Sequence, residues 1–120
     1  MKVIYVAGPY RDDCEFGVKE NIDRAEKVAL DIWRRGAAAI CPHKNTAFFG
    51  GAYGLDDSVW LKGDLELLLR CDAVVTVEGW ENSSGALREV AEAKEKGIPV
   101  FHDRSSFHAW LKSMNIFMRI

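Results

Sequence analysis

The chain has 120 residues, a formal net charge of −2 at pH 7 and a hydrophobic content of 48%. This length suits one hydrophobic core, so we expect a single domain over residues 1–120. The slightly acidic balance argues against a surface for nucleic acid polymers or a basic membrane patch. Three cysteines without a CxxC pair indicate a reduced, cytoplasmic protein, and we expect neither a metal ion nor a cofactor.

The first predicted strand is the apolar run KVIYVA at residues 2–7, which is typical of a strand buried on both faces. It is too short for a membrane span, and no other apolar segment is long enough. Gly8 and Pro9 end this strand in a turn. A helix is predicted over residues 18–35, with Gly36 just beyond its C-terminus. Its inward-facing residues are expected to be Val18, Ile22, Ala25, Ala29, Ile32 and Trp33.

The middle of the chain contains a short strand, a long loop and a second helix. The strand covers residues 37–41, AAAIC. The loop at residues 43–57 has three glycines, and its aromatic side chains favour a lid or an interface over disorder. Asp56 or Asp57 is expected to cap a helix that runs to about Arg70. The inward-facing residues of this helix are expected to be Leu61, Leu65, Leu68 and Leu69.

The last part of the chain continues the alternation of strands and helices. A third strand is predicted at residues 72–79, and a loop and helix follow over residues 80–97. Residues 98–102 form a fourth strand, and residues 105–113 form a short helix capped by serine. The tail at residues 114–120 either adds a fifth edge strand or packs on a partner chain. Its apolar residues, with the aromatic loop, predict a homodimer or higher homo-oligomer.

This alternation predicts an α/β fold with a parallel sheet, helices on both faces and the strand order 2-1-3-4-5. Ligands of such sheets bind at the carboxyl ends of the strands, near the switch point between the first and third strands. The rule selects two loops, at residues 8–13 and 78–85. The functional residues are therefore expected in these two loops and in the helices beside them.

The second loop leads into a helix through Ser83, Ser84 and Gly85. Unpaired backbone N–H groups, two hydroxyls and a glycine suit a phosphate or another anion, although an ordinary serine cap explains the same sequence. Glu89 lies one turn further and has Gly85 and Ala93 four residues away on either side, so it lacks a basic partner. It is either the nucleophile or base of a pocket, or an acid favoured by the helix dipole.

Other candidate residues also have two readings. Asp64 forms a carboxylate pair with Glu89 for chemistry across a glycosidic bond, or it is an exposed helix acid. Tyr10 and Arg11 belong to the first loop, where arginine clamps a phosphate or carboxylate, or pairs with a neighbouring acid. His43 contacts a ligand or anchors the lid. No GxxxxGK[ST], GxGxxG or GxSxG motif occurs, which excludes several common nucleotide-binding and hydrolase sites.

Trp80 precedes the serine loop and either stacks on a base or closes the pocket wall.

The segments IYVAGPYR, LKGDLELLLRCDAVV and GWENSSGALREVAEAKEKGIPV together resemble the nucleoside 2-deoxyribosyltransferase superfamily. The chain is similar to its 2′-deoxynucleoside 5′-phosphate N-hydrolases and to its small bacterial and phage domains. The resemblance covers residues 3–101 and implies a flavodoxin-like, three-layer α/β/α fold.

The resemblance also implies a function and a set of roles. The function is cleavage or transfer at the N-glycosidic bond of a 2′-deoxynucleoside or its 5′-monophosphate, and the alternative is a non-catalytic nucleotide-binding or sensing domain. The glutamate nucleophile falls on Glu89, and the aspartate that assists the leaving base falls on Asp64. A serine that helps hold a 5′-phosphate falls on Ser83. The loop near the sugar and base falls on Gly8, Pro9 and Tyr10.

Overall fold

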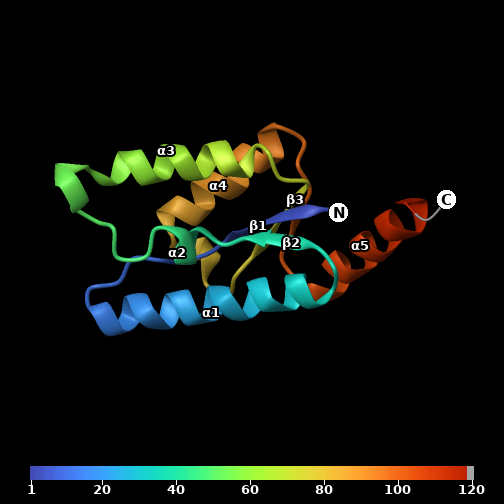
Figure 1. Ribbon diagram of the computed structural model, residues 1–120, viewed down its shortest axis with the longest axis horizontal. Helices are drawn as coiled ribbons and strands as arrows, with labels where there is room; N and C mark the ends of the chain where they lie inside the picture. Colours follow the sequence, from blue (N-terminus) through green and yellow to red (C-terminus); the bar gives the residue numbers. More distant parts are fainter. Residues whose placement is uncertain (119–120) are drawn as a thin grey trace.

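The computed structural model describes residues 1–118, with the side chains of residues 1–114. Four parallel strands form one sheet in the order β2-β1-β3-β4, as expected for the first four strands. The strands are β1 (Val3–Ala7), β2 (Ala38–Ile40), β3 (Ala73–Thr76) and β4 (Val100–Phe101). Helices α1 (Glu15–Arg34) and α5 (Arg104–Met118) lie on one face of the sheet, and α3 (Asp57–Leu68) and α4 (Ser84–Glu95) lie on the other (Figure 1).

The two faces of the central strand β1 supply two separate cores, because side chains alternate along a strand. Ile4 and Val6 are buried on the face that carries α1 and α5. Tyr5 and Ala7 are buried on the face that carries α3 and α4. Tyr5 pairs in register with Val74 of β3, so its ring lies in the middle of the sheet. The strand predicted as buried on both faces is therefore confirmed.

Helix α1 begins three residues earlier than predicted. The thiol of Cys14 accepts a hydrogen bond from the backbone N–H of Gly17 and acts as the N-terminal cap. Gly36 has a φ of 86° just beyond the helix, which fits its predicted place. Trp33 is 53% exposed, so the prediction that it faces inward is wrong. Successive residues of a helix point about 100° apart, so when Ile32 faces the core its neighbour Trp33 points away from it.

Helix α3 is capped by Asp56, whose carboxylate accepts a hydrogen bond from the backbone N–H of Ser58. Leu68 is fully buried, as predicted. Leu61 and Leu69 are 36% and 39% exposed, so the prediction that they face the core is wrong. Leu61 borders a cavity, and Leu69 lies at the end of the helix. The long loop before α3 contains two short helical turns, α2 (Pro42–Asn45) and η1 (Ala52–Gly54).

The C-terminal segment forms a longer helix than predicted. Helix α5 continues to Met118, so an edge strand beginning at residue 114 is wrong, and residues 119–120 lie outside the described part. The expected apolar tail residues Ile116, Phe117, Met118 and Ile120 have no described side chains. Asp103, and not a serine, accepts the hydrogen bond from the backbone N–H of Ser106 at the helix start. Among the described residues, no helix is both long and apolar enough to cross a membrane.

Candidate active site

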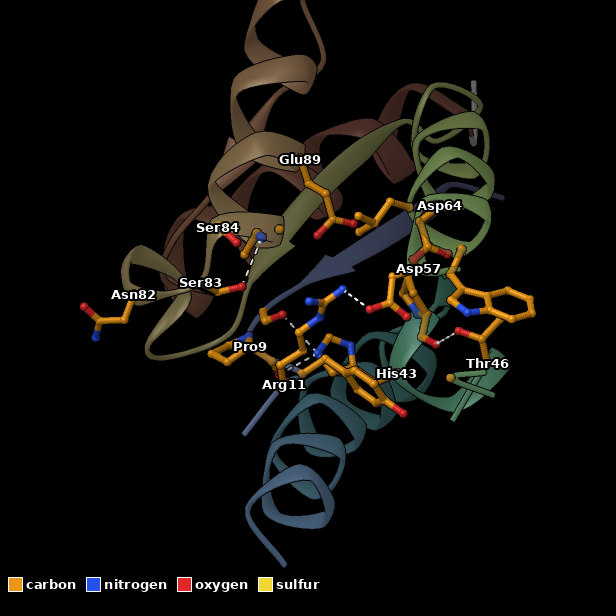
Figure 2. A pocket seen from close by; sticks show the side chains of 18 residues that line it. Pro9, Arg11, His43, Thr46, Asp57, Asp64, Asn82, Ser83, Ser84 and Glu89 are labelled. Atoms are coloured by element: carbon orange, nitrogen blue, oxygen red, sulfur yellow. Dashed lines mark hydrogen bonds and ion pairs between the residues drawn. The ribbon is translucent and has the colours of Figure 1, made fainter. Parts of the chain in front are cut away.

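A cavity of about 390 Å³ lies at the carboxyl ends of β1 and β3. The loop after β1, the turn α2 and the beginnings of α3 and α4 surround it (Figure 2). Both loops that the strand-end rule selects contribute to its wall. The predicted site residues that line it are Gly8, Pro9, Tyr10, Arg11, His43, Asp64, Ser83, Ser84, Gly85 and Glu89.

Glu89 projects from α4 into this cavity, where burial raises the pKa of its carboxyl group to about 7. The negative charge of Asp64 raises the pKa further, whereas a hydrogen bond from the Tyr5 hydroxyl to Glu89 Oε2 lowers it. No ion pair among the described side chains includes Glu89. The carboxylate therefore has a neutral donor but no neutralising cation, which preserves its nucleophilicity.

Asp64 projects from α3 into the same space, and Figure 2 shows its carboxyl group and that of Glu89 directed into the gap between the two helices. Burial raises the pKa of Asp64 to about 6. Since the pKa values of both acids lie near neutrality, the pair holds about one proton in this range. Because the pKa of Glu89 is the higher of the two, the proton lies mainly on Glu89, and the form with an ionised Glu89 and a protonated Asp64 is the minor singly protonated form.

Tyr5 is a site residue that sequence reasoning missed. It is fully buried on β1, and its hydroxyl donates to Glu89 across 84 residues of sequence. Burial raises the pKa of Tyr5, and the charge of Glu89 raises it further, so the hydroxyl stays protonated as a donor. A signal was available in the sequence, because a tyrosine in an otherwise apolar buried strand needs a partner for its hydroxyl.

The start of α4 serves both the helix and the cavity. Ser83 is the N-terminal cap, since its Oγ accepts a hydrogen bond of 3.2 Å from the backbone N–H of Ala86. Ser84 and Gly85 line the cavity beside it. A Cβ atom added at Gly85 would meet only Ser83 Oγ, at 3.9 Å, so the protein itself does not fill this space. The free backbone N–H groups and the positive end of the helix dipole suit an anionic or hydroxylated ligand end.

The loop after β1 reaches the cavity because it passes close to the end of β3. A Cβ atom at Gly8 would lie 2.5 Å from Val77 Cβ, so only glycine fits without a shift. His43 of α2 fixes this loop by donating from Nε2 to the carbonyl oxygens of Gly8, at 3.1 Å, and Pro9, at 2.8 Å. Burial lowers the pKa of His43, which favours the neutral ring. His43 therefore anchors the wall and also lines the cavity.

Two further contacts fasten the long loop over the cavity. The backbone N–H of Phe48, whose φ is 58°, donates to the Tyr10 hydroxyl at 2.6 Å. Arg11 forms an ion pair with Asp57 at the start of α3, and both residues line the cavity (Figure 2). The sequence did not single out Asp57 as a site residue, because the partner of Arg11 was expected among its immediate neighbours. The arrangement fits the predicted role of this loop as a lid.

Trp80 is the one predicted site residue that does not line the cavity. It begins the turn η2 (Trp80–Asn82), which follows Gly79 with a φ of 89°. The indole stacks on His102, with ring centroids 4.6 Å apart and an angle of 10° between the planes. The turn thus directs Trp80 toward the end of β4. Asn82, at the end of the same turn, lines the cavity in its place.

Comparison with known proteins connects this geometry to a family. The family described as "Domain of unknown function (DUF7768)" matches residues 2–103. The chain belongs to this family. No curated protein matches the sequence of this DUF7768 domain.

Solved structures give two informative likenesses to this DUF7768 domain. A conserved protein from Enterococcus faecalis V583 is 22% identical, with a TM-score of 0.68 over 96% of this chain and 75% of that chain. A 2-deoxyribosyltransferase from the psychrotolerant bacterium Bacillus psychrosaccharolyticus is 21% identical, with a TM-score of 0.58 over 82% of this chain and 69% of that chain. At these identities the likeness establishes the fold, which is the expected flavodoxin-like α/β fold.

Proposed function

We propose that this protein cleaves or transfers the N-glycosidic bond of a 2′-deoxynucleoside or its 5′-monophosphate, as a member of the nucleoside 2-deoxyribosyltransferase superfamily. One observation carries the proposal. Two acids from different helices, Glu89 and Asp64, project into one cavity, neither forms an ion pair among the described side chains, and burial raises the pKa of both. Perturbed carboxyl groups that line the same cavity are typical of acid–base and nucleophilic sites.

In the first step, the ionised carboxylate of Glu89 attacks the anomeric carbon C1′. The bond between C1′ and the base nitrogen breaks, and its electron pair leaves with the base. Asp64 donates its proton to the base, so that a neutral base departs. The product is a glycosyl ester on Glu89. The hydroxyl of Tyr5 orients Glu89 and stabilises its charge before attack.

In the second step, the glycosyl ester is cleaved by a group that approaches C1′ from the side that the base has left. Water, or the nitrogen of a second base, attacks C1′ and releases the carboxylate of Glu89. Asp64, now ionised, takes the proton from the attacking group and is ready for another cycle. Two displacements retain the configuration at C1′. Water gives hydrolysis and a second base gives transfer, through the same intermediate.

The remaining wall residues position the substrate in this scheme. The α4 start at Ser83, Ser84 and Gly85 holds the 5′ end of the sugar, where backbone N–H groups suit a hydroxyl or a phosphate. The loop at residues 8–11 and His43 lie beside the sugar and the base. Arg11 supplies a positive charge for a 5′-phosphate when it leaves Asp57. The partner is therefore a small nucleoside or nucleotide.

The proposal is tested by incubating purified protein with a panel of 2′-deoxynucleosides and their 5′-monophosphates. Chromatography then measures free base, and a second base in the mixture reports transfer. We expect release or exchange that disappears in Glu89→Ala. Absence of both reactions across the panel, or release that Glu89→Ala leaves unchanged, contradicts the proposal. Ligand-dependent melting shifts without turnover would instead support a nucleotide sensor.

We also expect a homo-oligomer. The lid loop exposes Phe48, Phe49 and Tyr53, which are 58%, 45% and 100% exposed in the single chain. An apolar cluster of this kind is typically covered by a partner. Light scattering of the purified protein measures the mass directly, and a monomer at all concentrations contradicts this expectation.

A further inference from the structure

Two buried polar atoms of the candidate cavity have no hydrogen-bond partner. Among the described side chains, the unpaired buried atoms are His43 Nδ1 and Trp60 Nε1, and both residues line the cavity. Such atoms are uncommon in folded proteins, and each costs about 1–3 kcal/mol. Because both exceptions occur in one cavity, a bound ligand is the natural source of the missing partners.

The chemistry of the two atoms is fixed by their surroundings. The indole N–H of Trp60 can only donate. His43 Nε2 faces the carbonyl oxygens of Gly8 and Pro9, which can only accept, so Nε2 carries the ring proton. Burial lowers the pKa of His43, which keeps the ring neutral and leaves Nδ1 as an acceptor. The two residues therefore hold one unpaired donor and one unpaired acceptor, both buried, for a ligand that enters this wall.

The position of Trp60 links it to the leaving base. Trp60 and Asp64 are four residues apart on α3, so they lie on the same face of the helix. Asp64 is the proposed proton donor to the base, and Trp60 therefore addresses the same edge of the base. His43, on α2, lines the same cavity. The ring of Phe49 packs edge-on against Trp60, with centroids 5.7 Å apart.

We propose that Trp60 and His43 read the leaving base and select a 6-oxopurine, an inference that rests on the proposed function. Protonation at N7 turns a purine into a good leaving group, and the 6-substituent lies next to N7. A 6-oxo group accepts from the Trp60 N–H, and the neighbouring N1–H donates to His43 Nδ1. A 6-amino group instead turns a donor toward Trp60, and its N1 has no proton for His43.

The test compares the binding of 2′-deoxyinosine and 2′-deoxyadenosine, which differ only at these positions. Calorimetry with Glu89→Gln measures affinity without turnover. We expect 2′-deoxyinosine to bind about 10- to 100-fold more tightly, since a polar site rejects a mismatched analogue. Adding Trp60→Phe should weaken 2′-deoxyinosine about 10-fold and leave 2′-deoxyadenosine unchanged. Trp33→Phe, at a half-exposed position of α1, is the matched control and should change neither affinity.

A second probe needs no change in the wall. 1-Methyl-2′-deoxyinosine keeps the 6-oxo group but lacks the N1 proton, and it should bind about 10-fold more weakly than 2′-deoxyinosine. Equal affinity for 2′-deoxyinosine and 2′-deoxyadenosine overturns the inference, as does full affinity for the methylated probe. Base release by the wild-type protein would still uphold the proposed function in those cases. Absence of both binding and release would overturn the two proposals together.

Discussion

Two cavities lie at the carboxyl edge of the sheet, and the acids that line them differ in their partners and in the direction of their pKa shifts. The candidate active site, of about 390 Å³, lies beside α3 and α4. A second cavity, of about 340 Å³, lies on the other face beside α1 and α5 and contains Asp31. Asp31 accepts a hydrogen bond of 2.9 Å from His108 and pairs with Arg35 at 3.4 Å. Burial opposes ionisation of Asp31, but these partners outweigh it and lower its pKa.

The difference separates an acid whose charge is neutralised by partners from the two acids to which the proposed function assigns the chemistry. The partners of Asp31 bind its charge and connect two helices. Glu89 and Asp64 line a cavity of similar size, neither forms an ion pair among the described side chains, and the pKa of each is raised. The size of a cavity and its place at the sheet edge therefore do not indicate an active site. Acids without a neutralising partner do indicate one, because such groups stay reactive at a cost in stability.

The largest expected effect comes from exchanging the charged groups of the two cavities for amides. Glu89→Gln should lower base release by at least about 1000-fold, because the nucleophile is lost. Asp31→Asn should leave release unchanged but lower the free energy of unfolding by about 1–2 kcal/mol, because a partnered charge is lost. Turnover assays and urea denaturation measure the two effects. Equal losses of activity in the two variants would contradict the assignment of catalysis to one cavity and of stability to the other.

The next effect concerns the proton donor. Asp64→Asn should lower base release by about 100- to 1000-fold, which is within the range for general acid catalysis. A substrate whose base is already positively charged, such as 7-methyl-2′-deoxyguanosine, needs no proton and should be cleaved almost normally by this variant. Steady-state rates of the wild type and of Asp64→Asn with both substrates show whether Asp64 donates this proton. An equal loss on the charged substrate would exclude Asp64 as the acid.

The raised pKa of Glu89 also predicts a dependence of stability on pH. The ordinary pKa of 4.5 becomes about 7 on folding, so between these values the folded protein keeps a proton that the unfolded chain has released. Glu89 therefore reduces stability as pH rises through this window, by up to about 3 kcal/mol. Glu89→Gln should remove this loss and gain stability relative to wild type between pH 4 and 8 (about 3 kcal/mol in all). Urea denaturation at several pH values measures the free energy of unfolding of both proteins. A difference between them that does not change with pH would contradict the prediction.

A smaller effect is expected at Tyr5, which acts by positioning Glu89. Tyr5→Phe removes the hydroxyl donor and should lower base release by about 10- to 100-fold, as expected for a hydrogen bond to a charged group. It should also raise the pKa of Glu89, which is the higher of the two pKa values, and move the basic limb of the pH–rate profile upward, because the bond lowers that pKa. A rate loss with no shift of the profile would indicate a packing role alone.

The smallest effect is expected at the exposed ion pair over the cavity. Asp57→Asn should change the free energy of unfolding by no more than about 1 kcal/mol, since both side chains are more than half exposed. It should tighten the binding of 5′-monophosphates relative to nucleosides, because Arg11 is released and a like charge is removed. Calorimetry with each class of ligand measures the ratio. An unchanged ratio would show that Arg11 does not meet the phosphate.

The sequence was most informative where structure depends on neighbouring residues. Periodic apolar residues predicted the four strands and the helices between them, and Gly36 and Asp56 marked helix ends. The edge strand proposed for the tail was wrong, because the apolar residues from position 114 onward fit both a strand and the continuation of a helix. Trp33 was misread because hydropathy does not tell which of two adjacent apolar residues faces the core.

The site was predictable in its location but not in its contacts. The strand-end rule and the resemblance brought Glu89 and Asp64 together, and the lack of a basic partner for Glu89 could be read from helix spacing. The Tyr5 hydroxyl could not be assigned to Glu89, because the two residues are 84 positions apart. The same holds for Trp80, whose direction depends on the left-handed backbone at Gly79.

The central claim is that Glu89 becomes covalently bound to the sugar. The most direct measurement uses a 2′-deoxynucleoside with fluorine at C2′ in the arabino configuration, because fluorine slows hydrolysis of the glycosyl ester. Mass spectrometry of the intact protein, followed by peptide mapping, should find one added fluorosugar on Glu89, and none in Glu89→Gln. Base release without any adduct on Glu89, or an adduct on another residue, would contradict the account.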